Sequence, residues 1–557
     1  MAEDRTIPTC RRFAVITLTV AALWPAPGGA AVDTPALTAY ARARLADNDG
    51  ALTLATANYR IAFDADPASL AVALRAYRQA IASGDMVLAV RTARALDAAE
   101  GLPRDGALLL TVDALIRKDW ASARAMTSRI AAEQNFAFLA PILTSWITLG
   151  EGAYVPPIVG PTDKGAALTR RYINEHAALQ ALSLGRTDEA IKVIDVVMAM
   201  RPTGLAGFRI YAAERLATLG QRDKAITLLP ESAPGVAALR AQIMAGKKMK
   251  APPLTAAQGV GRLLARLSDD VAAADDARSV AMTLARFAVF ADPTNAEARV
   301  GLAQQLMETD RAGAALTELE RVPAKSPFRA VAQDVTVQAL AEAGAQDDAI
   351  TLAEALAARP DAGPVQYQRL GGVLADAGRY DAAAASFEKA KAAYPADTAP
   401  WSLWLLLGGA LERAGRWDES RTALEEAARL APNEAVVLNY LGYAQVERRQ
   451  NVPAALALLQ KASKLKPDDP SITDSLGWAH FIAGDSKTAV PVLERAAIGA
   501  PDDATINEHL GDALWTVGRR FEARYAWAAA RPFAEDKAQE RLDAKMTEGL
   551  RPEYAAP

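Results

Sequence analysis

The chain has 557 residues and a formal net charge of −4, from 62 basic and 66 acidic residues. With no basic excess to neutralise phosphates, the charge argues against a general nucleic-acid binder, and the single cysteine excludes intramolecular disulfides, cysteine-based zinc sites and iron–sulfur clusters. Hydrophobic residues make up 51% of the sequence but aromatic residues only 6%, so the apolar content is aliphatic and favours closely packed helices.

Residues 1–31 have the order of a secretory signal peptide. Basic residues at Arg5, Arg11 and Arg12 precede an apolar run over residues 13–24, and prolines and small residues follow up to Ala31. This order predicts export with cleavage after Ala31, although an accidental apolar run in a disordered tail is the alternative. The run is shorter than the roughly 20 residues that cross a bilayer, so no integral membrane segment is expected after the signal is removed.

Residues 32–250 predict an array of degenerate helical hairpins. Glycine, alanine and proline recur in a fixed order, at Gly50, Ala55 and Pro67 and again at Gly185, Ala190 and Pro202. Two stretches rich in proline and glycine interrupt the order. We interpret residues 150–161 as an inserted loop and residues 230–253 as the boundary with a second array.

Residues 251–530 predict a second array, whose pattern is clearest from Trp401 to Ala530. Leu-Gly pairs recur there with glycines at 408, 442, 477 and 511, at steps of 34, 35 and 34 residues. A glycine in this position lets a neighbouring helix pack against its backbone. A second glycine seven residues later ends the first helix at Gly415, Gly484 and Gly518, and prolines stop the second helix at Pro432, Pro467 and Pro501.

Residues 531–557 predict a capping helix and a tail. Leu542, Met546 and Leu550 are spaced four residues apart, which gives a helix one apolar face. The charged residues around these apolar positions, Arg541 and Lys545 among them, are expected to face water on the outer side. Such a helix covers the last hairpin of an array.

The 34-residue period with its glycines, alanines and closing prolines resembles the tetratricopeptide repeat (TPR) family. That resemblance implies an all-α fold, a right-handed superhelical solenoid of helix hairpins with a concave groove and a C-terminal capping helix. One hairpin cannot bury its apolar faces alone, so the hairpins must stack. By the 34-residue period, the chain would hold about 11 to 13 hairpins.

Three segments, 438–443, 474–478 and 508–515, carry a narrower resemblance. They are similar to the C-terminal half of long exported bacterial TPR proteins, among them outer-membrane lipoproteins that act as adaptors for periplasmic carboxyl-terminal processing proteases. This resemblance implies a non-enzymatic scaffold or adaptor, exported to the bacterial periplasm, with an association with the outer membrane left open. The chain departs from those lipoproteins because Cys10 precedes the apolar run and no cysteine follows it, which puts a lipid anchor in doubt.

The family resemblance also implies which residues line the groove, namely those three positions before and one position after each Leu-Gly glycine. With the residues four positions after Gly477 and Gly511, the rule gives Asn439, Tyr443, Asp474, Trp478, Phe481, Glu508, Asp512 and Trp515. We expect these residues to bind a protein or peptide segment, and their acidic bias favours a basic or neutral one. The alternative is that the aromatic residues pack between repeats and that Asp474 stabilises a helix start.

The sequence shows few ingredients for catalysis. Its three histidines lie on different repeats, and it contains no motif for a metalloprotease, a serine hydrolase or a phosphate-binding loop. No cofactor and no metal are therefore predicted. Two alternatives to the adaptor stay open, a platform for envelope polysaccharide assembly or export and an enzyme with a dispersed site near His480 and His509. The client, the oligomeric state and whether the chain fills its own groove, for instance with residues 150–161, also stay open.

Overall fold

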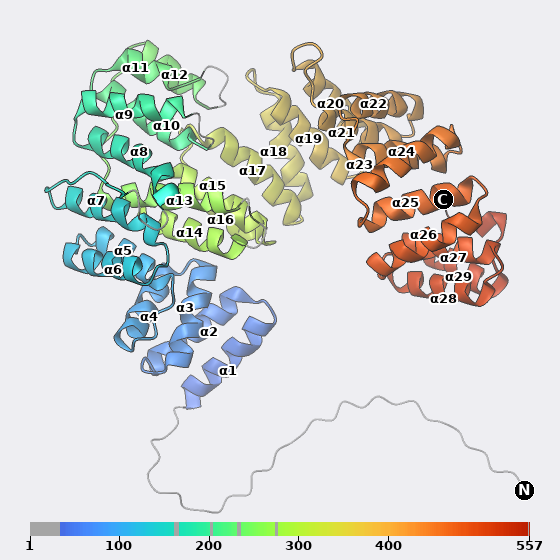
Figure 1. Ribbon diagram of the computed structural model, residues 1–557, viewed down its shortest axis with the longest axis horizontal. Helices are drawn as coiled ribbons and strands as arrows, with labels where there is room; N and C mark the ends of the chain where they lie inside the picture. The colour runs from blue at the N-terminus through green and yellow to red at the C-terminus, as the bar shows by residue number, and fades with distance from the viewer. Residues whose placement is uncertain are drawn as a thin grey trace, which may run out of the picture. The chain divides into compact units, whose positions relative to one another are not determined.

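The computed structural model describes residues 34–160, 166–200, 204–230, 235–272, 274, 277–554 and 556. Over these residues the chain forms 29 α-helices and no β-strand, and hairpins of antiparallel helices follow one another (Figure 1). The prediction of an all-α repeat fold is confirmed. The predicted signal peptide lies outside the described residues. None of the described helices is both long enough and apolar enough to cross a membrane.

The helices form two compact units, the first of which contains Met1–Thr203, Pro253–Ser268 and Ser279–Pro293. Its helices are α1 (Thr34–Asn48), α2 (Leu52–Ala65), α3 (Leu70–Ser83), α4 (Met86–Ala98), α5 (Gly106–Ile116), α6 (Trp120–Ala132), α7 (Ala140–Gly150), α8 (Ala166–Ser183), α9 (Thr187–Ala199) and most of α13 (Ala256–Ala272) and α14 (Arg278–Ala291). The predicted loop after Gly150 is confirmed over residues 151–160, which contain no helix.

A buried tryptophan shows why α13 belongs to the first unit. Trp146 on α7 packs against Gly259 on α13 so closely that a Cβ atom at Gly259 would overlap the indole ring. The indole Nε1 donates a hydrogen bond to Nδ1 of His176 on α8, over 3.0 Å. Burial, with the positive charge of Arg262, lowers the pKa of His176 to about 3, so this histidine is neutral and structural.

The second unit contains Gly204–Pro252, Asp269–Arg278 and Thr294–Pro557. Its helices are α10 (Ala206–Thr218), α11 (Arg222–Thr227), α12 (Ala237–Met244), α15 (Ala296–Met307), α16 (Ala312–Glu320), α17 (Arg329–Glu342), α18 (Gln346–Ala357), α19 (Pro364–Asp376), α20 (Tyr380–Ala392), α21 (Trp401–Arg413), α22 (Trp417–Leu430), α23 (Ala435–Glu447), α24 (Val452–Leu465), α25 (Pro470–Ile482), α26 (Ser486–Gly499), α27 (Ala504–Thr516), α28 (Arg520–Ala530) and α29 (Asp536–Glu548). From α15 on, each hairpin packs against the next in chain order.

The chain passes between the two units more than once. One crossing falls between Pro252 and Pro253, next to the boundary predicted at residues 250 and 251. Because residues 253–268 and 279–293 return to the first unit, the contacts divide the chain differently from a single cut. The division into an N-terminal and a C-terminal array stays a prediction.

The Leu-Gly glycines have the packing role that their spacing predicts. A Cβ atom at Gly477 on α25 would lie 2.6 Å from Cγ of Leu493 on α26, and one at Gly511 on α27 would overlap the indole of Trp527 on α28. These positions require glycine, because the second helix of the hairpin occupies the space that a Cβ atom would need. The stopping glycines are confirmed too, since Gly484 has a φ of 83° and α25 ends just before it.

One turn departs from this rule and explains the 35-residue step. Four residues separate α23 from α24, whereas three separate α25 from α26. The longer turn has no glycine, and both Arg449 (φ 50°) and Asn451 (φ 48°) adopt the left-handed backbone conformation, which is unfavourable for residues with a Cβ atom. The extra residue of the period therefore lies in this turn.

The predicted capping helix is α29. Leu542 is fully buried and packs in a cluster with Leu514 and Trp527, and Met546 and Leu550 pack against the same cluster. One part of the prediction was wrong, because Lys545 does not face water. Its side chain is 0% exposed, because it is paired with the buried carboxylate of Glu508.

Candidate functional site

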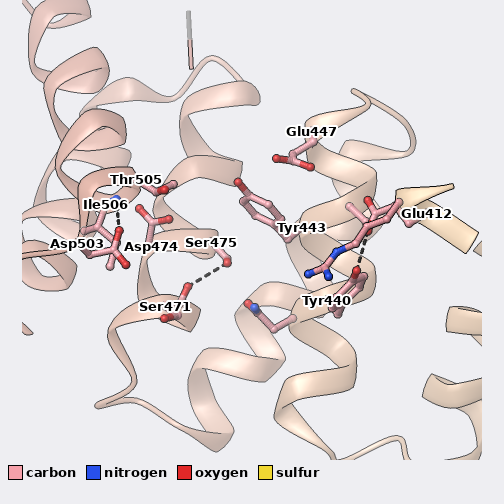
Figure 2. Close-up of a pocket in the computed structure, with 13 residues that line it drawn as sticks. Glu412, Tyr440, Tyr443, Glu447, Ser471, Asp474, Ser475, Asp503, Thr505 and Ile506 are labelled. Carbon is pink, nitrogen blue, oxygen red and sulfur yellow. Dashed lines mark hydrogen bonds between the residues drawn. The ribbon is translucent and has the colours of Figure 1, made fainter. Parts of the chain in front are cut away.

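Four successive first helices of the second unit line one pocket of about 400 Å³. We call the surface formed by α21, α23, α25 and α27 the first-helix face. The residues around the pocket include Glu412 of α21, Asn439, Tyr440, Tyr443 and Glu447 of α23, Ser471, Asp474 and Ser475 of α25, and Asp503, Thr505 and Ile506 at the start of α27 (Figure 2). Every wall of the pocket therefore comes from a different repeat.

Asn439 and Tyr443 supply the polar and aromatic groups at its centre. Tyr443 projects from α23 toward Asp474 and Ser475 of α25 (Figure 2), and burial, together with the nearby carboxylate of Glu447, raises the pKa of its phenol. The Oδ1 atom of Asn439 is buried and has no hydrogen-bond partner among the described residues. A buried acceptor without a partner costs about 1–3 kcal/mol, which a hydrogen-bond donor that reached it would recover.

Carboxylates surround the pocket, but several are engaged within the chain. Glu412 accepts hydrogen bonds from the Tyr440 hydroxyl over 2.7 Å and pairs with Arg448 over 2.8 Å. Asp503 caps α27 by accepting from the backbone N–H of Ile506 over 3.0 Å. These contacts fix the direction of each carboxylate, which leaves an acidic but ordered rim. The preference for a basic or neutral segment stays a prediction.

Asp474 joins the pocket to a buried aromatic stack. Its Oδ2 atom lies 2.9 Å from Nδ1 of His509 on α27, and the His509 ring stacks on Trp478 with centroids 3.9 Å apart. The ring of Phe481 also stacks on Trp478, with centroids 4.8 Å apart. Burial disfavours the charged form of His509, but Asp474, Asp512 and Glu508 outweigh it and raise the pKa of this imidazole. Trp478 is only 1% exposed and packs in a cluster with residues of α23 and α24, and its predicted contact with a partner stays a prediction.

Glu508 and Asp512, both on α27, are closed over by α29. Glu508 accepts two hydrogen bonds from Arg541, each of 2.7 Å, and one from Lys545 Nζ over 2.6 Å. Lys545 also donates to Asp512 over 2.7 Å. Burial would raise the pKa of Glu508, but Arg541 and Lys545 hold it below its usual range; burial raises the pKa of Asp512 although Lys545 opposes it. Both acids are thus paired with basic residues of α29, and their predicted contact with a partner stays a prediction.

Trp515 is partly buried in the same region. Its ring lies 5.5 Å from that of Trp527, and the guanidinium groups of Arg520 and Arg524 lie over it at 5.2 and 5.0 Å. The predicted set is thus divided by the structure. Asn439, Tyr443 and Asp474 line the pocket, whereas Trp478, Phe481, Glu508, Asp512 and Trp515 belong to the packed region beside it.

Several pocket residues were not predicted from the sequence, and the glycine spacing could have predicted one of them. The position four residues after a Leu-Gly glycine was applied to Gly477 and Gly511, but the same rule at Gly408 gives Glu412, which lines the pocket. Asp503 and Thr505 lie at the start of α27 rather than near a glycine, so the spacing rule could not find them.

The two histidines of the enzyme alternative do not share a site. His509 is buried in the aromatic stack, whereas His480 lies 3.9 Å from Asp485, and neither lines the pocket. Among the described residues there is no group of three or more histidine, cysteine and acidic side chains that could hold a metal ion. The arrangement offers hydrogen-bonding and aromatic groups for binding.

The comparisons with known proteins identify the repeats. Residues 367–397 and 401–446 match tetratricopeptide-repeat families. A TPR repeat-containing protein of Pseudomonas aeruginosa, PA4667, is 45% identical over 53 residues, which are 10% of this chain and 9% of that protein. These two stretches of the chain are therefore tetratricopeptide repeats. The chain's match spans less than a tenth of the length of this curated relative.

Solved structures give weaker likenesses. One structure of MamA is 25% identical, covers 30% of this chain and 95% of its own, and has a TM-score of 0.26. The Cut9–Hcn1 assembly of the APC/C covers 86% of this chain at 15% identity, with a TM-score of 0.40. YrrB, described as a TPR protein with an unusual peptide-binding site, is 17% identical with a TM-score of 0.24. The assignment of the repeats in residues 367–397 and 401–446 rests on the family matches alone.

Proposed function

We propose that this protein is a non-enzymatic scaffold that binds an extended segment of a protein partner on its first-helix face, in the pocket at Asn439 and Tyr443. TPR proteins typically serve as such scaffolds, and the finer assignment is our own. The single observation that carries it is the unpartnered Oδ1 atom of Asn439 within a pocket built by four successive repeats.

The chemistry of the pocket favours an extended backbone with neutral or basic side chains. Asn439 offers an acceptor for a backbone N–H group, and the ring of Tyr443 offers a face for an apolar or cationic side chain. Glu412, Glu447 and Asp474 would repel an acidic segment. An extended peptide gains affinity from such main-chain hydrogen bonds and specificity from the side chains beside them.

We further propose that the scaffold works in the bacterial cell envelope as an adaptor for a protease or for envelope assembly. The order of basic, apolar and small residues in residues 1–31 supports export, and the resemblance of residues 400–530 to exported adaptor proteins supports the role. Fractionation of cells and N-terminal sequencing test the export. We expect a periplasmic form that begins at Val32, and a cytosolic form that keeps Met1 would contradict it.

Photo-crosslinking in native envelopes tests the binding site. A photo-reactive phenylalanine derivative replaces Tyr443 in one variant, and Tyr525 serves as the matched control because it is also a tyrosine and is 76% exposed on α28. We expect one dominant protein adduct from position 443 and none of that mass from position 525. Adding Asn439→Ala should lower the yield of the adduct about 5-fold, which corresponds to the loss of one hydrogen bond of about 1 kcal/mol.

The identity of the adduct separates the finer roles. A protease, or a protein that a protease cuts, supports the adaptor, whereas a component of polysaccharide assembly or export supports the platform. Equal adducts from both positions would mean that Tyr443 is only another surface residue, and the proposed site would be abandoned. For the enzyme alternative, substituting His480 and His509 together should leave the adduct from position 443 in place if the protein is a binder.

A further inference from the structure

The end of the chain makes a contact with the first-helix face beyond the pocket. After α29 ends at Glu548, Gly549 lies against the indole of Trp515, and Leu550 packs beside it. Ala556 then packs against a buried cluster that contains Trp478 and Ala479 of α25. The tail therefore crosses from the last helix to an earlier repeat.

The contact is polar as well as apolar. The backbone N–H of Ala556 donates a hydrogen bond to Oδ2 of Asp512 over 3.2 Å. The Asp512 carboxylate is 0% exposed and already accepts from Lys545 and from Nε1 of Trp527, over 2.7 and 2.9 Å. These bonds fix the carboxylate from within the fold, so it is a preorganised acceptor for a backbone N–H group.

The residues between the two ends of the tail are held by α29 and not by the first-helix face. Arg551, Pro552 and Glu553 are exposed, Arg551 pairs with Glu548 of α29 over 2.9 Å, and the hydroxyl of Tyr554 bonds to the same Glu548 over 3.2 Å. Of residues 551–554 and 556, only Ala556 has contacts with the first-helix face. A partner segment could therefore displace the tail there without breaking its contacts with α29.

We infer that Trp478 and Asp512 form a second subsite of the first-helix face, and that Ala556 of the chain's own tail occupies it as an intramolecular ligand. The subsite takes a backbone N–H group and a small side chain of an extended segment. It adjoins the pocket, because Asp474 of the pocket pairs with His509, which stacks on Trp478. The inference rests on the proposed function, since a partner segment that runs from Tyr443 past Asp474 would compete with the tail.

The occupancy of the subsite is tested first in the isolated protein. A photo-reactive residue replaces Pro557, and the adducts within the chain are located by peptide mass spectrometry. We expect them on α25 and α27. Ala556→Pro removes the N–H donor and should lower their yield about 5-fold, whereas Ala556→Ser keeps the donor and should leave the yield unchanged.

Two results would overturn the subsite. Adducts scattered along the chain without preference for α25 and α27 would mean that the tail does not dock there. Equal yields from Ala556→Pro and Ala556→Ser would mean that the hydrogen bond to Asp512 contributes nothing. Far-UV circular dichroism of each variant confirms that the helices are intact.

The competition is tested in the full chain with a protease site inserted between Leu550 and Arg551, so that the tail is released after folding. Cutting should raise the yield of the partner adduct from position 443 several-fold, and an unchanged yield would overturn the competition. If position 443 captures no partner before or after cutting, the proposed function fails. The adducts from position 557 would still establish the subsite, so the two failures are distinguishable.

Discussion

Two neighbouring parts of the first-helix face use equivalent positions in opposite ways. Asp474, three residues before Gly477, lines a pocket. Glu508, three residues before Gly511, lies beneath α29 and is paired with Arg541 and Lys545. The repeat places an acid at both positions, and only the second meets a basic helix of the same chain. The position within a repeat therefore directs a side chain to this face, while the neighbouring element decides whether it stays available to a partner.

The closed part should be far more sensitive to the loss of a charge than the pocket. Lys545→Met leaves the carboxylates of Glu508 and Asp512 short of a buried cation, which typically costs about 3–5 kcal/mol. Chemical denaturation and hydrogen exchange of α27 to α29 measure the change. Lys537→Met, at an exposed position of the same helix, is the control and should stay within about 0.5 kcal/mol. Equal stabilities of the two variants would show that the buried pairs do not hold α29 in place.

The hairpin of the closed part should also resist any added volume. Gly511→Ala drives a methyl group into the indole of Trp527, and overpacking of this kind costs about 1–3 kcal/mol. Gly372→Ala is the control, because nothing lies within 4 Å of a Cβ atom at that helical glycine. It should stabilise the protein by about 0.5–1 kcal/mol. A stabilising Gly511→Ala would contradict the close approach of α27 and α28.

The histidine between the two parts makes stability depend on pH. The pKa of His509 is raised above its ordinary 6.5, because Asp474 and the other acids outweigh burial. A raised pKa in the folded state means that the stabilisation is fully present below about pH 6.5 and is lost as the pH rises through the folded value. As the pH is raised from 6, the denaturation midpoint of the natural protein should fall, and that of His509→Gln should not. Parallel profiles would show that His509 carries no charge in the fold.

The pocket should show the opposite behaviour, with an effect on binding but none on stability. Asn439→Ala removes a buried acceptor that has no partner among the described residues, so the thermal midpoint should not fall. Capture of the partner at position 443 should fall by about 5-fold, or about 1 kcal/mol. A large loss of stability instead would place Asn439 in the structural framework.

The smallest expected effect lies in the turn between α23 and α24. Arg449 has a φ of 50°, and glycine adopts this conformation without the steric cost of a Cβ atom. Arg449→Gly should therefore stabilise the protein by about 0.5–1 kcal/mol, as measured by denaturation. The control is Gln450→Gly in the same turn, at a residue without a positive φ, and it should give no gain.

Much of this fold could be predicted from the sequence because the residues that repeat have a fixed role in packing the helices. Gly442 and Gly477 mark helix crossings that leave no room for a Cβ atom, and counting from these glycines led to Asn439, Tyr443 and Asp474 on the pocket wall. The closing of Glu508 and Asp512 could not be predicted in the same way. Lys545 lies 37 residues from Glu508 on a helix whose charges looked suited to water, and nothing local indicates that it turns inward.

We expect the first-helix face to be available to a partner at the pocket of Asn439, Tyr443 and Asp474, and to be closed by α29 over Glu508 and Asp512 of α27. The most direct test places the same photo-reactive residue at Tyr443 and at Trp515 in otherwise identical proteins within native envelopes. We predict a dominant partner adduct from position 443 and, from position 515, adducts only within the chain, chiefly to α29. Partner adducts from position 515 with none from position 443 would contradict it.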